Sequence, residues 1–340
     1  MNYLKFILSY LFFNSVINAD YECPIIQSNY LRKNTNTLRI MQYNVEWLFV
    51  DQYKSCPGTG CTWINESESL KHMSYISDVI NKLNPDIINL CEVEGCDELS
   101  LLNDELTENY NYYLKKGTDT GTGQNVGMLT KINPLKNLYR DDEYYNYPLK
   151  DTECGNTTAS GSTGVSKHYI TEFNVNNINI AFIGIHLLAI PTDPSRCVQR
   201  EGQAQIIQNI VFNYINDGYE IIVIGDFNDY DNEILDVNNN KPTSMVLDII
   251  KGNKGDYANK YELFNVNENI DHDERYSDWW DSDSNCNTNS INDYSLIDHI
   301  LVSEKIKSKI YNTFIYHGYN EYCGKYNSDH YPLVIDLKFN

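Results

Sequence analysis

Polar side chains that could bind a cation or transfer a proton follow several short apolar segments of the chain. Carboxylates, amides and imidazoles of this kind stand at Asn44, Glu46, Glu92, Glu94, His186, Asp226, Asn228, Asp229, Asp298, His299, Asp329 and His330. Any one of them alone is typical of a turn, a helix cap or a satisfied core position. Their repetition beside apolar strands predicts one edge of an α/β sheet, where such folds form ligand sites.

These residue types suit the hydrolysis of a phosphate ester. Carboxylate and amide oxygens such as those of Asn44, Glu92 and Asp329 are the ligands that Mg²⁺ or Mn²⁺ prefers, and Ca²⁺ also takes oxygen ligands. His186 and His330 belong to the residue type that titrates near neutrality and transfers protons. The sequence therefore predicts a divalent cation and at least one imidazole at the same edge of a sheet.

Other kinds of catalytic site find no support in the sequence. It contains no GxSxG elbow and no cysteine in the context of a catalytic thiol, which argues against a covalent nucleophile. The glycine-rich segment 117–123 lacks the Gly-Lys-Ser/Thr ending of a P-loop, so we expect it to be a mobile loop. No Cys/His cluster has the spacing of a zinc site.

The elements that must position these residues alternate along the chain. Apolar periodicity predicts strands over 38–43, 86–91, 125–130, 167–175, 178–185, 220–224, 296–302, 310–316 and 333–339, and helices over 68–83, 97–107 and 196–215. Asn176-Asn177 is typical of a hairpin turn. No clear element begins at Leu247. Residues 267–292 form a polar segment rich in Asn, Asp and Ser, which we call the polar excursion. The alternation predicts one α/β domain with mixed sheets.

Composition narrows the class of protein. The chain has 340 residues, of which 47 are acidic and 26 basic, and its formal net charge is -21. A hydrophobic fraction of 41% is enough for a core and excludes a disordered chain. The acidity argues against binding nucleic acid by charge alone. It does not exclude an enzyme that meets phosphate through a cation, because carboxylates attract phosphate once they hold a metal.

The first segment is typical of a secretory signal peptide. Lys5 precedes the apolar stretch 6–17, and Ala19 provides a small residue at the expected cleavage point. We expect residues 1–19 to be removed, and 20–340 to form a single domain that is secreted or stays in the lumen of the secretory pathway. An uncleaved anchor is the alternative. No second apolar run is long enough to span a bilayer.

Nine cysteines in such a chain are expected to form mostly disulfides. They are Cys23, Cys56, Cys61, Cys91, Cys96, Cys154, Cys197, Cys286 and Cys323. The second and third flank a turn and could close a small loop, whereas Cys154 and Cys197 lie in predicted loops and could join distant segments. The pairing stays open, and the odd number leaves at least one thiol free or bonded to another chain. Sequons at Asn65 and Asn156 fit surface glycosylation.

The polar strand ends belong to an ordered set of short motifs that extends over residues 38–340. The set is similar to that of the endonuclease/exonuclease/phosphatase superfamily, which includes pancreatic-type deoxyribonuclease, apurinic endonucleases, neutral sphingomyelinases and inositol-polyphosphate phosphatases. The matching motifs are YNVEWLF at 43–49, NLCEV at 89–93, HL at 186–187, GDFND at 225–229, LIDHIL at 296–301 and SDHYP at 328–332. The resemblance implies a four-layer α/β sandwich, in which two mixed, mostly antiparallel β-sheets pack face to face with helices outside.

The resemblance also implies roles for the matching residues. Glu92 is similar to the main metal-binding carboxylate of the family, with Asn44 beside it and Asp329 as a further ligand or ligand support. Asp226 and Asn228 resemble the Asp-x-Asn pair that holds the scissile phosphate and polarises the attacking water.

The same resemblance implies that His330 is a general base or a phosphate-stabilising acid, that Asp298 orients it, and that His186 contacts phosphate or protonates the leaving oxygen. Family members differ on whether an aspartate or the histidine takes the proton of water. One departure concerns His186: where pancreatic-type deoxyribonuclease has a supporting glutamate, this chain has Lys167 and His168, which argues against the acid role of His186. Lys167 or His168 is expected to contact phosphate instead, with an ordinary pair on the strand surface as the alternative. A core or disulfide role is expected for the cysteine at 91, where many relatives have glutamine.

The substrate is left open between three classes. Motifs around Arg200 are similar to those of secreted nuclease members, and this arginine is expected to reach substrate, with a position on the helix surface as the alternative. Arg275, Trp279 and Trp280 lie where relatives place a substrate-facing loop, and a substrate contact is expected for Arg275. The two tryptophans could stack on bases, enter a lipid interface or belong to the core. We expect a monomeric, metal-dependent nuclease for DNA or RNA. The alternatives are a sphingomyelinase-like or small-molecule phosphoesterase and a non-catalytic binding relative.

Overall fold

The computed structural model describes residues 22–50, 61–63, 65–281, 285–286, 291–319 and 326–339. The expected signal peptide, together with Cys56 and Cys323, lies outside these residues. Within the described ranges, no helix is both long and apolar enough to cross a membrane.

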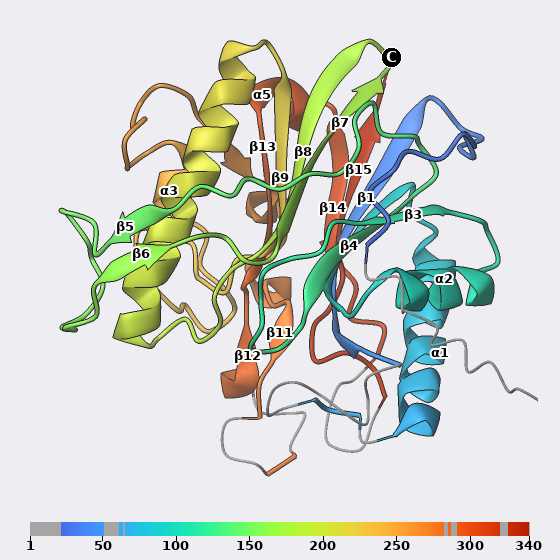
Figure 1. The fold of residues 1–340 in the computed structure, drawn as a ribbon, viewed down its shortest axis with the longest axis horizontal. Helices are drawn as coiled ribbons and strands as arrows, with labels where there is room; N and C mark the ends of the chain where they lie inside the picture. Colours follow the sequence, from blue (N-terminus) through green and yellow to red (C-terminus); the bar gives the residue numbers. More distant parts are fainter. Residues whose placement is uncertain are drawn as a thin grey trace, which may run out of the picture.

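Two mixed sheets form the centre of the molecule (Figure 1). The first has the order β14-β15-β1-β2-β4-β3, with bounds Ile310–Ile315, Leu333–Lys338, Thr37–Leu48, Ile87–Val93, Asn125–Thr130 and Asn111–Leu114. The second has the order β10-β13-β9-β8-β7, with bounds Phe264–Asn265, Asp298–Val302, Glu220–Asp226, Ile178–His186 and His168–Val175. Only β1 with β2 and β8 with β9 run parallel among the pairs within these two sheets.

Helices cover the outer face of each sheet, as Figure 1 shows with α3 on one side and α1 and α2 on the other. Their bounds are Glu66–Leu83 for α1, Cys96–Glu105 for α2, Pro194–Asn216 for α3, Val246–Lys251 for α4 and Glu304–Lys307 for α5. One apolar cluster lies between the two sheets. A second lies between one sheet and its helices, and a third lies between the other sheet and its helices. Three core layers between four layers of elements confirm the predicted α/β sandwich.

Local sequence signals explain where the main helices begin and end. The side chain of Asn65 accepts a hydrogen bond from the backbone of Glu68 at the start of α1, and Asn84 ends this helix in the left-handed region at φ 47°. Asp193 caps α3 in the same way, and Pro194 occupies its first turn. The predicted boundaries of these helices are therefore confirmed within a few residues.

Several small elements were not predicted from the sequence. The segment at Leu247 forms the six-residue helix α4, which is too short to show a helical period. The polar excursion contains β11 (Asp278–Trp279), which pairs with β12 (Tyr294–Ser295) at the lower edge of Figure 1. Two further short strands, β5 (Tyr145–Tyr147) and β6 (Gly161–Thr163), form a ribbon of their own.

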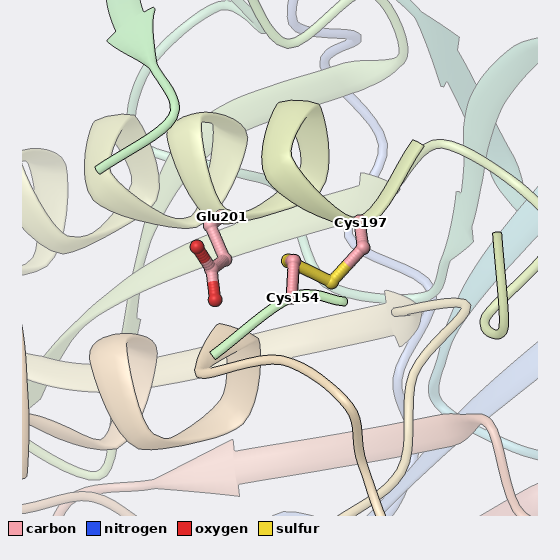
Figure 2. Close-up of side chains that lie close together, drawn as sticks. All are labelled: Cys154, Cys197 and Glu201. Atoms are coloured by element: carbon pink, nitrogen blue, oxygen red, sulfur yellow. A yellow bond between two sulfur atoms is a disulfide. The ribbon is translucent and has the colours of Figure 1, made fainter. Parts of the chain in front are cut away.

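Two disulfides between described residues join segments that are distant in the sequence. Cys23 bonds to Cys96 at the start of α2, and Cys154 bonds to Cys197. The second pairing corrects one expectation, because Cys197 lies in α3 and not in a loop; Figure 2 shows its disulfide beside Glu201, one turn further along the helix. Cys91 is a free, buried thiol, as one of the two expected roles allows.

Candidate active site

The topology brings the polar strand ends to a single edge. β1 and β2 run parallel in one sheet and β8 and β9 run parallel in the other, so each pair ends on the same side. His186 and Asp226 are register partners at the ends of β8 and β9, and Asp298 at the start of antiparallel β13 faces Asp226. A cavity of about 570 Å³ opens at this edge, and its lining includes Glu92, His186, Asp226, Asn228, Asp329 and His330.

Asn44 is the centre of the site. Its Nδ2 atom lies 3.2 Å from Asp226 Oδ2, 3.3 Å from Glu92 Oε1 and 3.4 Å from His330 Nε2. The other oxygen of Glu92 accepts a hydrogen bond of 3.1 Å from the backbone of Trp47. One amide thus connects the expected metal ligand of the first sheet with the expected catalytic carboxylate of the second.

The backbone at this edge departs from regular strand geometry. Glu46, Trp47, Glu92 and Asn228 all have φ between 48° and 68°, in the left-handed region that non-glycine residues rarely adopt. The pairing of β1 with β2 shifts its register between Asn44 and the end of the strand. Bulges of this kind redirect side chains, and strained backbone of this kind clusters at functional sites.

His330 lies between two carboxylates. Its Nδ1 is 2.7 Å from Asp298 Oδ2, and its Nε2 is 3.5 Å from Asp278 Oδ1. Asp298 is itself held by side-chain hydrogen bonds from Gln42 (2.9 Å) and Ser277 (2.8 Å). Burial acts to lower the pKa of His330, but the surrounding carboxylates, Asp298 first, raise it well above its ordinary value.

Asp226 and Asn228 form the second half of the site. Asp226 Oδ1 accepts the backbone N–H of Asn228 at 2.8 Å, and its Oδ2 accepts the amide of Asn228 at 3.1 Å. That amide also donates to the carbonyl of Leu187 at 3.2 Å, which fixes it beside His186. Burial raises the pKa of Asp226 to about 7, and the nearby Asp298 acts in the same direction.

The carboxylates of the site fit a divalent cation. Glu92, Asp278 and Asp329 all line the cavity, and ligand atoms of Asp278, Asp329 and His330 lie within 4.8 Å of one another. Burial, followed by the charge of Glu46, raises the pKa of Asp329 well above its ordinary value, and burial raises that of Asp278 to about 6. A bound cation would offset this excess of buried negative charge, and oxygen donors of this kind suit Mg²⁺ or Mn²⁺.

Two of the expected substrate contacts are wrong. Arg200 is fully buried in α3: its Nε lies 2.9 Å from Asp229 Oδ2, and its other nitrogens donate to backbone carbonyls of the 188–191 segment. His168 is also buried, and hydrogen bonds with Val165 and Asp141 occupy both of its ring nitrogens. Neither side chain can reach a ligand in the cavity.

The other two expected contacts lie outside the cavity lining. Arg275 donates from Nε to the carbonyl of Ile270 at 2.8 Å and braces its own loop. Lys167 is buried behind His186, with its Nζ 3.3 Å from His186 Nε2.

Sequence reasoning did not predict that Asp278 lies at the site, nor which apolar residues line the cavity. Asp278 stands within the polar excursion, and its pairing with β12 and the bridge to His330 bring it to the site. Trp280 is 68% exposed and lines the cavity, whereas Trp279 is buried in the core between the sheets. Ile190, which is 50% exposed, lines the cavity as well. The tryptophan pair was the only sequence signal for this wall.

Comparison with known proteins agrees with this geometry. The model of the Endonuclease/Exonuclease/phosphatase family matches residues 41–330. The chain belongs to this family. Family members are typically phosphoric ester hydrolases and generally use divalent metal ions. None of the curated protein sequences is similar enough to the chain to count as a match.

Solved structures of the family share the fold at low sequence identity. Truncated Caenorhabditis elegans TDP2 is 15% identical, with a TM-score of 0.50, and the match covers 90% of this chain and 100% of that one. A family protein from Beutenbergia cavernae is 14% identical, with a TM-score of 0.53 and coverage of 90% and 72%. One from Bacteroides thetaiotaomicron is 16% identical, with a TM-score of 0.52 and coverage of 90% and 99%.

Proposed function

We propose that the protein is a metal-dependent phosphodiesterase whose substrate is DNA or RNA. The observation that carries this proposal is the meeting of Glu92, Asp226 and His330 around the Nδ2 atom of Asn44, within 3.4 Å, at the edge of a cavity. A metal ligand, a carboxylate and an imidazole at this spacing can act on one phosphate group.

The arrangement supports attack by water in line with the leaving oxygen. Glu92, Asp278 and Asp329 would hold the cation, with the amide oxygen of Asn44 as a further ligand; when bound, the cation offsets negative charge on the phosphate oxygens. Asp226 lines the cavity, and hydrogen bonds from Asn44 and Asn228 orient its carboxylate, so it can polarise the water. No covalent intermediate on the protein is required.

The remaining side chains stabilise the reacting phosphate. The two N–H groups of the Asn228 amide donate to Asp226 and to the carbonyl of Leu187, so a phosphate oxygen bound by this amide would take the place of one of these acceptors. His330, with its ring held by Asp298, places positive charge at the cavity as negative charge develops in the transition state. His186 faces the same cavity and provides a further contact to phosphate or to the leaving oxygen.

The cavity walls bear on the choice of substrate. Exposed Trp280 provides a face on which a nucleobase can stack. The described residues that line the cavity include no lysine or arginine, so binding of polynucleotide should be weak and should depend on the cation. The same absence of basic groups, next to exposed Ile190 and Trp280, favours a second candidate substrate: a lipid or small-molecule phosphodiester with an apolar group.

A panel of substrates tests the proposal. The chain is incubated with single-stranded DNA, RNA, duplex plasmid and sphingomyelin vesicles, with Mg²⁺ or Mn²⁺ and then with EDTA. We expect cation-dependent cleavage of a nucleic acid that is lost in Asp226→Asn and retained in Asp273→Asn, whose carboxylate is exposed and lies outside the cavity lining. Cleavage of vesicles alone would select the second candidate, and no hydrolysis of any diester would refute the proposal.

We also propose that residues 20–340 form a secreted, glycosylated monomer. The two disulfides support an oxidising compartment, and Asn156 in its sequon is exposed. Expression in a eukaryotic secretory host should release the chain, starting at residue 20, into the medium. A glycosidase should reduce its mass, and light scattering should give the mass of one chain; retention of residues 1–19 would contradict the proposal.

A further inference from the structure

Lys167 places a buried ammonium group against one of the two imidazoles of the site. The residue immediately precedes β7, and its carbonyl accepts the backbone N–H of His186 at 2.9 Å, which sets the two side chains side by side. Its Nζ lies 3.3 Å from His186 Nε2, and the two residues are 7% and 3% exposed. Lys167 does not line the cavity, whereas His186 does.

The glycine-rich loop holds this ammonium in place. Asp119 accepts hydrogen bonds from the backbone of Gly121 and Thr122 and from the hydroxyl of Thr122, which closes a tight turn. The Oδ2 atom of Asp119 is 3.8 Å from Lys167 Nζ, and the Oε1 atom of Gln124 is 3.3 Å from it. The glycine-rich segment 117–123 and the adjacent Gln124 therefore have a structural role: they provide acceptors for the ammonium of Lys167.

The contact with Lys167 favours one tautomer of His186. An ammonium group only donates hydrogen bonds, so Nε2 of His186 must accept and carries no proton. The remaining ring proton is then on Nδ1, which has no hydrogen-bond partner among the described residues. Protonating Nε2 would place two cations 3.3 Å apart in a buried site.

The other charged groups around His186 do not reverse this effect. Asp226 on β9 places its Oδ2 3.5 Å from Nε2 and favours a cation, whereas His330 on the opposite sheet opposes one. Burial, Lys167 and His330, in that order, lower the pKa of His186 well below its ordinary value. The result is opposite to that for His330, which lies between carboxylates.

We propose that Lys167 is a positioning residue that keeps His186 neutral with its proton on Nδ1, so that His186 meets substrate as a neutral hydrogen-bonding group. The positive charge near His186 then belongs to the ammonium of Lys167, which the imidazole separates from the cavity. The effect of this assignment on catalysis rests on the proposed function, whereas the protonation of His186 can be tested without it. It replaces the expectation that Lys167 touches phosphate, and of the two roles expected for His186 it keeps the contact with phosphate.

Nuclear magnetic resonance of the imidazoles tests the proposal without any substrate. The full chain, with and without Mg²⁺, is labelled with ¹³C and ¹⁵N in histidine only. The chain contains seven histidines, so the spectrum of His186→Gln identifies the signal of interest. We expect His186 to show an unprotonated Nε2 at pH 7 and a titration midpoint below the ordinary value of histidine, which is near 6.5.

Variants at Lys167 then separate charge from packing. Lys167→Glu replaces the cation by an anion and should raise the titration midpoint of His186 by about 2 pH units. Lys167→Gln should raise it by less, and Lys167→Arg should leave it low; if the glutamate variant does not fold, the glutamine variant decides the direction. A midpoint near or above 6.5 in the unchanged chain, or a midpoint that no variant moves, would overturn the proposal.

Kinetics on whichever diester is hydrolysed provide a second readout. We expect Lys167→Gln to lower kcat about tenfold or more with a smaller change in KM, and Lys167→Arg to recover most of the loss. The two proposals fail independently. A chain that hydrolyses no diester but shows the expected imidazole titration refutes the proposed function alone, and an active chain with an imidazolium at His186 refutes the role of Lys167 alone.

Discussion

Replacing Arg200 by methionine should destabilise the fold and should not act through substrate binding. The guanidinium is fully buried, bonds to Asp229 at 2.9 Å, and donates to the carbonyls of Leu188, Ile190 and Pro191 at 2.9 to 3.2 Å. Methionine fills much of the space but leaves a buried carboxylate and three carbonyls without their donor. Breaking a buried ion pair from one side costs about 3–5 kcal/mol, a large share of a stability of roughly 5–15 kcal/mol.

Urea denaturation at pH 7, followed by tryptophan fluorescence and far-ultraviolet circular dichroism, measures this loss. The midpoint should fall while the slope stays constant, because the surface exposed on unfolding is unchanged. Adding Asp229→Asn to Arg200→Met removes the unpaired charge and should recover part of the loss. The reasoning would be refuted by a loss below about 1 kcal/mol together with a large rise in KM, because that pair of results belongs to a substrate contact.

Three further predictions concern the metal site, a disulfide and a buried histidine. Asp278→Asn should weaken Mn²⁺ binding about tenfold in calorimetric titration; unchanged affinity would exclude Asp278 from the site. Replacing Cys154 and Cys197 by serine opens a link across 43 residues and should lower the free energy of unfolding by about 4 kcal/mol, with an unchanged urea midpoint as the contrary result. Burial lowers the pKa of His168 to about 3, below the value near 6.5 in the unfolded chain. The contribution of neutral His168 to the free energy of unfolding is therefore fully present above about pH 6.5 and is lost as the pH falls. His72, whose pKa burial lowers to about 4, also contributes to the loss of stability in acid, so the His168 share is the difference between the unchanged chain and His168→Gln. Between pH 7 and 5 this difference should be about 2 kcal/mol, and equal losses in the two chains would contradict the assignment.

The expected site could be located from sequence because each of its residues ends or begins an apolar strand. Asn44, Glu92, His186 and Asp226 follow runs whose alternation or length predicts a strand, and all four meet at one edge in the structure. A strand end has few possible positions once the sheet topology is known. The ordered motifs provided that topology, and the fold confirms it.

Residues whose position depends on distant pairing could not be placed in this way. Asp278 reaches the site because β11 pairs with β12 and bridges to His330, and no local periodicity encodes that contact. Arg200 was misplaced because α3 is buried on several faces, between the sheet on one side and loops and α4 on the other. On such a helix an arginine can be buried if its charge is paired, and here the carboxylate of Asp229 provides the partner.

The choice between Lys167 and His168 could have been narrowed by physical reasoning alone. Neighbouring residues of a strand point to opposite faces, so Lys167 and His168 could not both face a ligand. In the structure Lys167 lies beside His186, whereas His168 is held away from it by hydrogen bonds with Val165 and Asp141. Strand alternation was a sufficient signal to choose one of them.

The most direct test of the site as a whole is plasmid relaxation by residues 20–340, compared with the His330→Ala variant, in Mg²⁺ or Mn²⁺ and again in EDTA. We predict nicking that requires the cation and falls about 10²-fold or more in the variant, while circular dichroism shows that the variant is folded. Full nicking activity in folded His330→Ala, or nicking that persists in EDTA, would contradict the assignment of catalysis to this edge of the sheets.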